Sequence, residues 1–119
     1  MNKQELWKYG EKTAKDYLTE KGYEILDENF KIMGGEIDLI TKKDNSIIVI
    51  EVKTRTNENW MPLEETIDDK KIGFLEEAFE EWLFRKNYPE TFWQIDFIGI
   101  IVRPNEVIEK IVHIENIGL

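Results

Sequence analysis

Cysteine is absent from the 119-residue sequence, and histidine occurs only once, as His113. Without cysteine the chain can form neither a disulfide framework nor a zinc site with thiolate ligands. A single histidine also excludes a histidine-rich metal site. A bound metal would therefore be held mainly by oxygen atoms, and the lack of disulfides fits a reducing compartment such as the cytoplasm.

Long apolar runs are also missing, and none approaches the roughly 20 residues that a membrane span requires. The first 18 residues, MNKQELWKYGEKTAKDYL, have neither the apolar core nor the cleavage site of a signal peptide. We find no internal repeat, low-complexity tract or linker rich in proline or glycine. We therefore expect a single soluble, cytoplasmic domain over residues 1–119, with no membrane partner.

Basic residues are in the minority, with 16 Lys and Arg against 25 Asp and Glu, which gives a net charge of −9. Proteins that coat nucleic acid without sequence preference usually carry a basic surface, so the charge argues against that class. It does not exclude a nuclease, because net charge is a sum over the chain. A local basic patch beside a metal site can still hold phosphate.

The apolar spacing predicts an α/β fold, with helices on the faces of a mixed sheet of about five strands. Residues 3–21 and 66–86 have helical periodicity, and Thr66 with Asp69 would form a capping box for the second helix. Trp7 and Trp82 are predicted to lie in the core. Strands are predicted over residues 23–30, 35–41, 47–55, 92–102 and 107–114.

Residues 35–55 are typical of a β-hairpin that turns at Asp44-Asn45, because Asp and Asn tolerate the backbone angles of tight turns. This register places Ile40 opposite Val49, Asp38 opposite Glu51 and Glu36 opposite Lys53. Side chains alternate between the two faces of each strand. One face is then apolar (Ile37, Leu39, Ile48, Ile50, Val52), and the other changes from apolar near the turn to charged (Asp38, Glu51, Glu36, Lys53, Arg55).

The predicted pairing of Asp38 with Glu51 places two carboxylates about 5 Å apart on the strands. Two such groups do not both ionise cheaply unless a cation lies between them. The cation could be a divalent metal, with Mg²⁺ or Mn²⁺ the best match to oxygen ligands, or Lys53 and Arg55 alone. A charged strand face is also typical of the solvent side of a sheet. A register shift of one residue would place Asp38 and Glu51 on opposite faces.

The residues Asp38 and Glu51-Val52-Lys53 resemble the PD-(D/E)XK motif of nucleases. A wider set of segments occurs in order: GEKTAKDYL (10–18), GYEIL with Asn29, GEIDLI (35–40), EVKTR (51–55), Lys70 before Ala78, and QIDFIGI (94–100). Together they resemble the YraN-type family of small bacterial proteins, which are predicted to be similar to Holliday-junction resolvases. The resemblance covers nearly the whole chain, although Gln94 stands where we expect an arginine in that family.

This resemblance implies a restriction-endonuclease-like, three-layer fold and a metal-dependent endonuclease that hydrolyses phosphodiester bonds in DNA, including branched or single-stranded structures. It implies that Asp38, Glu51 and the Val52 carbonyl bind Mg²⁺ or Mn²⁺, while Lys53 orients the attacking water or stabilises the developing negative charge. Glu11 on the first helix would complete the acidic cluster. By analogy with resolvases, which cut two strands symmetrically, the protein would form a homodimer.

Further charged residues accompany this site in the sequence. Glu36 is a candidate metal ligand or general base, or simply the partner of Lys53. Arg55 is predicted to contact phosphate, with neutralisation of the acids as the alternative. Lys70 and Lys71 begin the second helix, where lysines are unfavourable for the helix dipole. This placement hints at a role in binding phosphate, for which Lys70 is the candidate, with ordinary exposed lysines as the alternative.

Four more residues have predictions outside this site. Asp96 interrupts an apolar strand and is expected to pair structurally with Arg55 or a lysine, and His113 is predicted to be structural. Trp60 is predicted to pack onto the domain or onto a second subunit, with stacking on an unpaired base as the alternative. Gln94 in place of the arginine and the acidic net charge both weaken the case for strong DNA binding. A non-catalytic module that binds nucleic acid or protein is therefore the alternative function.

Overall fold

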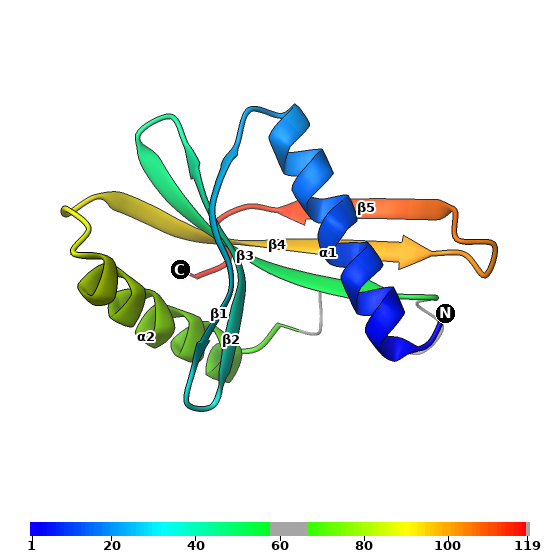
Figure 1. The fold of residues 1–119 in the computed structure, drawn as a ribbon, viewed down its shortest axis with the longest axis horizontal. Coiled ribbons are helices and arrows are strands. Elements are labelled where there is room, and N and C mark those ends of the chain that lie inside the picture. The colour runs from blue at the N-terminus through cyan, green and yellow to red at the C-terminus, as the bar shows by residue number, and fades with distance from the viewer. Residues whose placement is uncertain (58–66, 119) are drawn as a thin grey trace.

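In the part of the chain that the structure describes, five strands form one mixed sheet in the order β1-β2-β3-β4-β5 (Figure 1). Neighbouring strands are antiparallel except β3 and β4, which are parallel because the chain crosses between them through a helix. The computed structural model describes residues 1–57 and 67–118. The strands are β1 (Glu24–Ile32), β2 (Gly35–Lys43), β3 (Ser46–Arg55), β4 (Phe92–Val102) and β5 (Ile108–Ile114).

Two helices cover opposite faces of the sheet, and each buries an apolar stripe against it. Helix α1 (Lys3–Glu20) packs Ala14 and Leu18 onto one face. Helix α2 (Asp69–Lys86) packs Leu75, Ala78, Phe79 and Trp82 onto the other. The residues of β3 alternate between the two apolar clusters: Ile48, Ile50 and Val52 face α1, whereas Ile47 and Val49 face α2. This arrangement confirms the predicted α/β class and its three layers.

The helix starts show which polar residues stop the helices from fraying. Asn2 caps α1 by accepting a 2.8 Å hydrogen bond from the Glu5 amide, and Glu5 accepts a 3.0 Å bond from the Asn2 amide in return. Helix α2 begins directly after Asp68, whose side chain accepts a hydrogen bond from the Lys71 amide. Thr66, which was predicted to take part in a capping box, lies outside the described residues. Within the described part of the chain, neither helix is long and apolar enough to cross a membrane.

One expected face assignment in β2 is wrong. Ile37 and Leu39 were predicted to share a face, but Leu39 packs in the cluster beneath α1 and Ile37 in the cluster beneath α2. Residues two apart share a face only where a strand is regular. Asp38 lies between them, and the opposite position in β1 is Asn29, whose φ of 51° is left-handed. The strongly twisted β1–β2 hairpin in Figure 1 is therefore irregular at the level of Asp38.

Candidate functional site

Strands β2 and β3 part at the level of Asp38. Their ladder follows the register predicted from the Asp44-Asn45 turn, including Ile40 opposite Val49, and ends at the pair Leu39–Ile50. Beyond this pair, Asp38 Oδ2 accepts a 2.8 Å hydrogen bond from the Val52 amide. The carboxylate thus takes the place of a backbone partner where the strands separate.

The expected backbone pairing of Glu36 with Lys53 is not formed. Glu36 pairs instead with Lys31 of β1, because β2 follows the twisted β1–β2 hairpin once its ladder with β3 has ended. Asp38 and Glu51 are likewise not a ladder pair, since the last pair is Leu39–Ile50. Their side chains nevertheless meet across the gap.

Asp38 and Glu51 are buried, with only 6% and 8% of the two residues exposed, and their carboxyl groups are in contact. Burial raises the pKa of Asp38 well above its ordinary value, and the negative charge of Glu51 and a hydrogen bond between the two carboxyls raise it further. The amide of Val52 opposes this effect by stabilising the ionised form. Without a cation, the pair is expected to hold one proton at neutral pH.

A lysine from α2 approaches the same pair. Lys71 Nζ lies 3.3 Å from Glu51 Oε2, and the Lys71 side chain is one-third exposed. The sequence suggested a phosphate-facing role for both lysines of this helix start, with Lys70 as the candidate substrate-binding residue, and it did not predict the pairing of Lys71 with Glu51. The turn of α2 places Lys71 on Glu51, whereas Lys70 lines a second cleft beside it.

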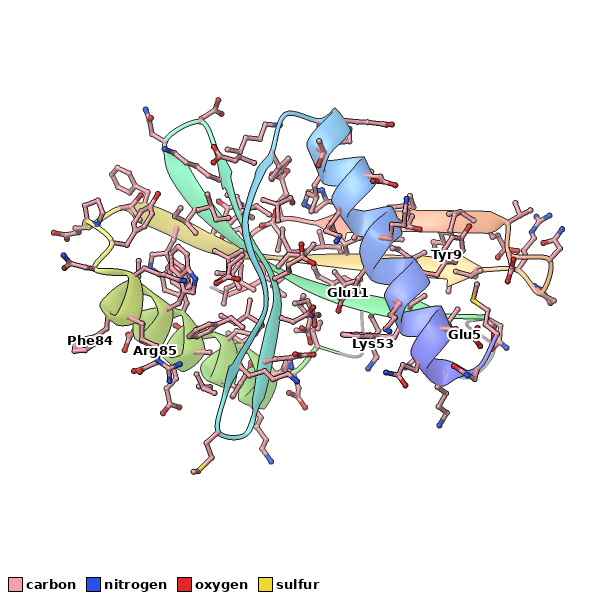
Figure 2. The ribbon with its side chains drawn as sticks, viewed as in Figure 1. Glu5, Tyr9, Glu11, Lys53, Phe84 and Arg85 are labelled. Atoms are coloured by element: carbon pink, nitrogen blue, oxygen red, sulfur yellow. The ribbon has the colours of Figure 1, made fainter. Side chains whose placement is uncertain are left out.

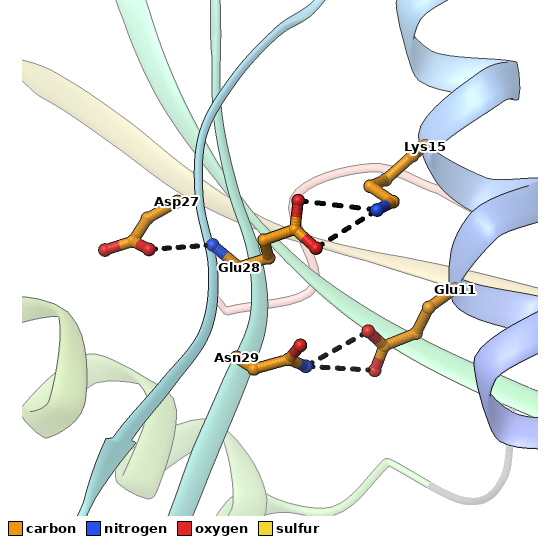
Figure 3. Close-up of polar contacts among 5 residues, drawn as sticks. All are labelled: Glu11, Lys15, Asp27, Glu28 and Asn29. Carbon is orange, nitrogen blue, oxygen red and sulfur yellow. Dashed lines mark hydrogen bonds and ion pairs between the residues drawn. The ribbon is translucent and has the colours of Figure 1, made fainter. Parts of the chain in front are cut away.

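Glu11 of α1 reaches the acidic residues from the opposite face of the sheet. Asn29 Nδ2 donates to both of its carboxylate oxygens, at 3.0 and 3.3 Å (Figure 3). Burial raises the pKa of Glu11, the bonds from Asn29 oppose that shift, and the nearby charge of Glu36 adds to it. Asn29 tolerates its left-handed backbone better than most residues do, which explains why an asparagine can hold Glu11 from this position.

The close approach of α1 to β3 depends on Gly10, the residue before Glu11. A Cβ atom at this position would lie 1.8 Å from Thr54 Oγ1 and 2.7 Å from Thr54 Cβ. Because atoms cannot approach so closely, any side chain here would push the helix away from the strand. Gly10 therefore allows the buried position that Glu11 occupies.

Glu36 is half-buried, and its Oε2 atom is fully buried with no hydrogen-bond partner among the described residues. A buried carboxylate oxygen normally has a partner, because burying a polar atom without one is costly. We name Glu11, Glu36, Asp38 and Glu51 the acidic cluster. The negative charges within this cluster act on each other: the charge of Glu36 raises the pKa of Glu11, and the charges of Glu51 and Glu11 raise the pKa of Asp38.

The acidic cluster borders an open cleft of about 980 Å³, named here the main cleft. It brings together six of the predicted site residues: Glu36, Asp38, Glu51, Val52, Lys53 and Arg55. The first turns of α1 also line it, through residues that include Lys3, Leu6 and Trp7. Glu11 is not one of the described residues that line this cleft, and Figure 2 shows it on α1 and Lys53 on β3. The second cleft, of about 530 Å³, shares Glu51, Lys53 and Lys71 with the main cleft and adds Lys70.

The donor set of the acidic cluster fits a hard divalent cation. Within residues 1–57 and 67–118, no three Asp, Glu, His or Cys side chains are arranged to hold one metal ion together. Mg²⁺, however, usually takes one or two carboxylates from the protein and keeps several waters. Asp38 and Glu51 provide two carboxylates in contact, and the unpartnered oxygen of Glu36 lies at the same cleft.

Asp96 lies elsewhere, and the prediction that it pairs with Arg55 or a lysine is wrong. Its fully buried carboxylate is bonded to His113 Nε2 at 2.7 Å, to the Gln94 amide group at 2.9 Å and to the Asn116 backbone amide at 3.0 Å. Tyr17 OH lies 3.0 Å from His113 Nδ1, so this network ties α1 to β4 and β5. Asp96 takes these partners because β4 and β5 place His113 opposite Ile98, a contact that local sequence does not reveal.

The predictions for the tryptophans are confirmed for one residue and wrong for another. Trp82 is buried as predicted, and its Nε1 donates a 2.9 Å hydrogen bond to Asp27. Trp7 is only half-buried, belongs to none of the apolar clusters of the described residues, and lines the main cleft. The prediction that Trp7 lies in the core is therefore wrong. Trp60 lies outside the described residues.

A family model for "Uncharacterised protein family UPF0102" matches residues 10–100, which include the acidic cluster, Lys53 and Arg55. The chain belongs to the UPF0102 family. This membership confirms the resemblance to the YraN-type family, which is the UPF0102 family.

Relatives within the UPF0102 family span nearly the same length. A UPF0102 protein of Syntrophomonas wolfei is 40% identical over 112 residues, which cover 94% of this chain and 96% of the relative. One from Caldanaerobacter subterraneus is 37% identical over 117 residues, covering 98% and 96%. One from Fervidobacterium nodosum is 41% identical over 120 residues, covering 98% and 84%. The family description assigns no activity, so function must be argued from the site.

Proposed function

We propose that this UPF0102 protein is a metal-dependent endonuclease that hydrolyses phosphodiester bonds in DNA. The observation that carries the proposal is the contact between the buried carboxyls of Asp38 and Glu51 beside Lys53, at the edge of an open cleft. Burying two acids together is costly for folding, and perturbed titratable groups in a cleft are typical of functional sites. The proposed place of action is the cytoplasm, on branched or single-stranded DNA.

Asp38, Glu51 and the Val52 carbonyl are the proposed ligands for Mg²⁺ or Mn²⁺. In a strand, the N–H and C=O of one residue point to the same side. Because the Val52 amide donates to Asp38 across the gap between β2 and β3, its carbonyl also faces that gap. When bound, the metal would polarise the phosphate and lower the pKa of a coordinated water.

The cations around the main cleft would act on the phosphate group. Lys53 is exposed and lies two residues after Glu51, so it can place positive charge where negative charge develops. Arg55, further along β3, would hold the neighbouring phosphate, and Lys70 would bind DNA from the second cleft. Glu36 would complete the metal's surroundings or accept a proton from water, and Glu11 would add negative charge behind the site.

A non-catalytic binding module that keeps this fold is the second candidate function. The ion pair between Lys71 and Glu51 favours it, because a lysine already offers a counter-charge to the acidic pair. The two functions differ in one requirement: the endonuclease needs a metal at Asp38 and Glu51, and the module does not. A homodimer, proposed because two-strand cleavage calls for two sites, can be tested for either function by analytical ultracentrifugation.

Calorimetric titration with Mn²⁺ tests the metal site without relying on activity. We expect saturable binding at millimolar or lower metal by the unaltered protein and none by an Asp38→Ala/Glu51→Ala variant. A Glu76→Ala/Glu80→Ala variant, which removes two exposed carboxylates from α2, should bind as the unaltered protein does. Absence of binding by the unaltered protein would remove the endonuclease proposal and leave the binding module.

Cleavage assays on flap, fork and four-way-junction DNA then test the reaction. Lys53→Ala should abolish most of the cleavage while keeping much of the Mn²⁺ affinity, because Lys53 is proposed to act on the phosphate and not on the metal. Lys86→Ala, at the far end of α2, removes a half-exposed lysine and should leave cleavage unchanged. Equal loss in both variants would show that Lys53 has no specific role.

A further inference from the structure

The part of the main cleft that is lined by the first turns of α1 carries an aromatic side chain that the proposed reaction does not use. Trp7 lies in the first part of α1, is half-buried and packs into none of the apolar clusters of the described residues. Phe79, Phe97 and Trp82 are buried in the core, and Phe84 and Phe92 are exposed. Trp7 instead lines the cleft that also contains Asp38, Glu51 and Lys53.

The helix fixes where Trp7 stands relative to the acids. Residues four apart on a helix lie on the same face, so Lys3, Trp7 and Glu11 form one line along α1. Successive members of this line are about 6 Å apart along the helix axis. The indole therefore lies about one helical turn from Glu11, whose charge acts on Asp38. The ammonium group of Lys3 comes one turn further out.

The cleft therefore offers three kinds of contact side by side: a cation-binding acidic pair, basic side chains and an aromatic face. Lys3, Lys53 and Arg55 all line it. This combination matches a nucleotide, whose phosphates are held by cations and whose base stacks on an aromatic ring. Bases within a duplex are already stacked on each other, so only an unpaired base can meet the indole in this way.

We propose that Trp7 stacks on the base of an unpaired nucleotide, and that the preferred substrate of this site is DNA with a single-stranded segment. The inference rests on the proposed function for the position of the cleaved phosphate, beside Asp38, Glu51 and Lys53. It assigns Trp7 as a substrate-binding residue that distinguishes unpaired from paired strands.

The test compares two fluorescent DNAs that differ only in their bases. Each is a duplex with a short single-stranded tail, made either of thymidines or of abasic nucleotides with the same charge. Anisotropy is measured in Ca²⁺ at low salt, and a gel confirms that the DNA stays intact. We expect the unaltered protein to bind the thymidine tail about tenfold more tightly than the abasic tail, because stacking of one base provides a gain of this size.

Trp7→Ala should bind both tails with equal affinity, and Trp7→Phe should keep part of the preference. Phe84→Ala removes an aromatic ring that is 76% exposed on α2, and it should keep the full preference. A merely structural role for Trp7 would weaken binding to both tails alike. The inference is overturned if the unaltered protein shows no preference, or if Trp7→Ala retains it.

Two combinations of results separate this inference from the proposed function, and the first of them uses the unaltered protein alone. Cleavage of DNA without a preference for the thymidine tail would overturn the role of Trp7 and leave the endonuclease. A preference that depends on Trp7, in a protein that binds no Mn²⁺ and cleaves nothing, would support the stacking site and overturn the endonuclease.

Discussion

Asp38 is where the requirements of folding and of the proposed function oppose each other. Its carboxyl is buried against a second acid, and a hydrogen bond from the Val52 amide compensates part of the cost of its ionised form. A folded chain without metal must therefore either leave Asp38 protonated or accept two neighbouring negative charges. Functional residues often carry such a cost, and removing the charge should reveal it.

Asp38→Asn is expected to stabilise the metal-free protein at neutral and alkaline pH. Asparagine has the shape of the protonated acid, so it can still accept from Val52 and donate to Glu51. The raised pKa of Asp38 means that the folded chain binds more protons than the unfolded chain above the ordinary value of 3.8. The stability of the unaltered protein therefore falls as pH rises from there toward the raised pKa, and the variant lacks this loss.

Urea unfolding of both proteins at several pH values measures this difference. We expect the free energy of unfolding of Asp38→Asn to exceed that of the unaltered protein by roughly 1–3 kcal/mol near pH 8. This difference should shrink toward zero near pH 4. Asp16→Asn, whose side chain is 64% exposed, is the control and should change little at either pH. A gain for Asp38→Asn that does not depend on pH would contradict the proton linkage.

Lys71 should modulate the metal affinity of the same pair. Lys71→Gln removes a positive charge 3.3 Å from Glu51, so Mn²⁺ would no longer compete with the Lys71 ammonium group for the Glu51 carboxylate. We expect Mn²⁺ to bind roughly fivefold more tightly in calorimetric titrations, as a single partly exposed charge would produce. Lys70→Gln is the matched control, since Lys70 is the preceding residue and lines only the second cleft. Equal effects of the two variants would show that net charge, and not the ion pair, sets the affinity.

At the scale of elements, the site depends on how α1 sits against β3. Gly10 lies in the middle of α1 and lets the helix contact Thr54, while the next residue, Glu11, is held by Asn29 of β1. Two segments far apart in the sequence are thus joined at one point. A shift of α1 would move Glu11 and Trp7 together, because both belong to the same rigid helix.

Two glycine-to-alanine substitutions should have opposite effects on stability. Gly10→Ala would place a methyl group 1.8 Å from Thr54 Oγ1, and such overpacking typically costs about 1–3 kcal/mol. Gly73→Ala in α2 meets nothing within 4 Å, and alanine should stabilise an exposed helix position by about 0.5–1 kcal/mol. Thermal or urea unfolding of both variants measures whether each substitution lowers or raises the free energy of unfolding.

A double variant tests whether Thr54 is the cause of the first effect. Thr54→Ala removes the two side-chain atoms beyond Cβ, so Gly10→Ala should cost less in that background than in the unaltered chain. If Gly10→Ala were as stable as the unaltered protein, α1 would have room to move, and the tight contact would not position Glu11.

The order of elements and the hairpin register could be predicted because both follow from local patterns. Apolar periodicity located α1, α2 and the strands, and the Asp44-Asn45 turn fixed which residues of β2 and β3 face each other. The end of the ladder at Leu39–Ile50 could not be predicted, because it depends on the twist that β1 imposes on β2.

The same limit explains the side-chain partners that the sequence did not reveal. The pairs Glu11–Asn29, Glu51–Lys71 and Asp96–His113 each join separate elements, so they depend on packing and not on spacing within one element. Trp7 was misplaced for a related reason. Its helical spacing from Ala14 and Leu18 suggests the buried face, but in the first turns of α1 Leu6 and Tyr9 pack against the apolar cluster, whereas Trp7 lines the main cleft.

At the scale of the whole molecule, the net charge of −9 opposes binding to DNA, while the main cleft gathers basic side chains. Lys3, Lys53 and Arg55 line it, and Lys71 joins them with its charge partly taken by Glu51. A chain with this distribution should hold DNA at a few defined phosphates and repel it elsewhere. Its affinity should then depend on salt only moderately, unlike that of a protein with a broad basic surface.

Binding to a tailed DNA at several salt concentrations in Ca²⁺ measures the number of phosphates held. Each contact to a single strand contributes about −0.7 to the slope of log affinity against log salt, so three cations predict a slope of about −2. Arg55→Gln should reduce the steepness by roughly 0.7, because it removes one such contact. Lys86→Gln, at the other end of α2, should leave the slope unchanged. A much steeper slope that Arg55→Gln does not alter would mean that DNA binds a different surface, and the main cleft would then lose its role as the DNA-binding site.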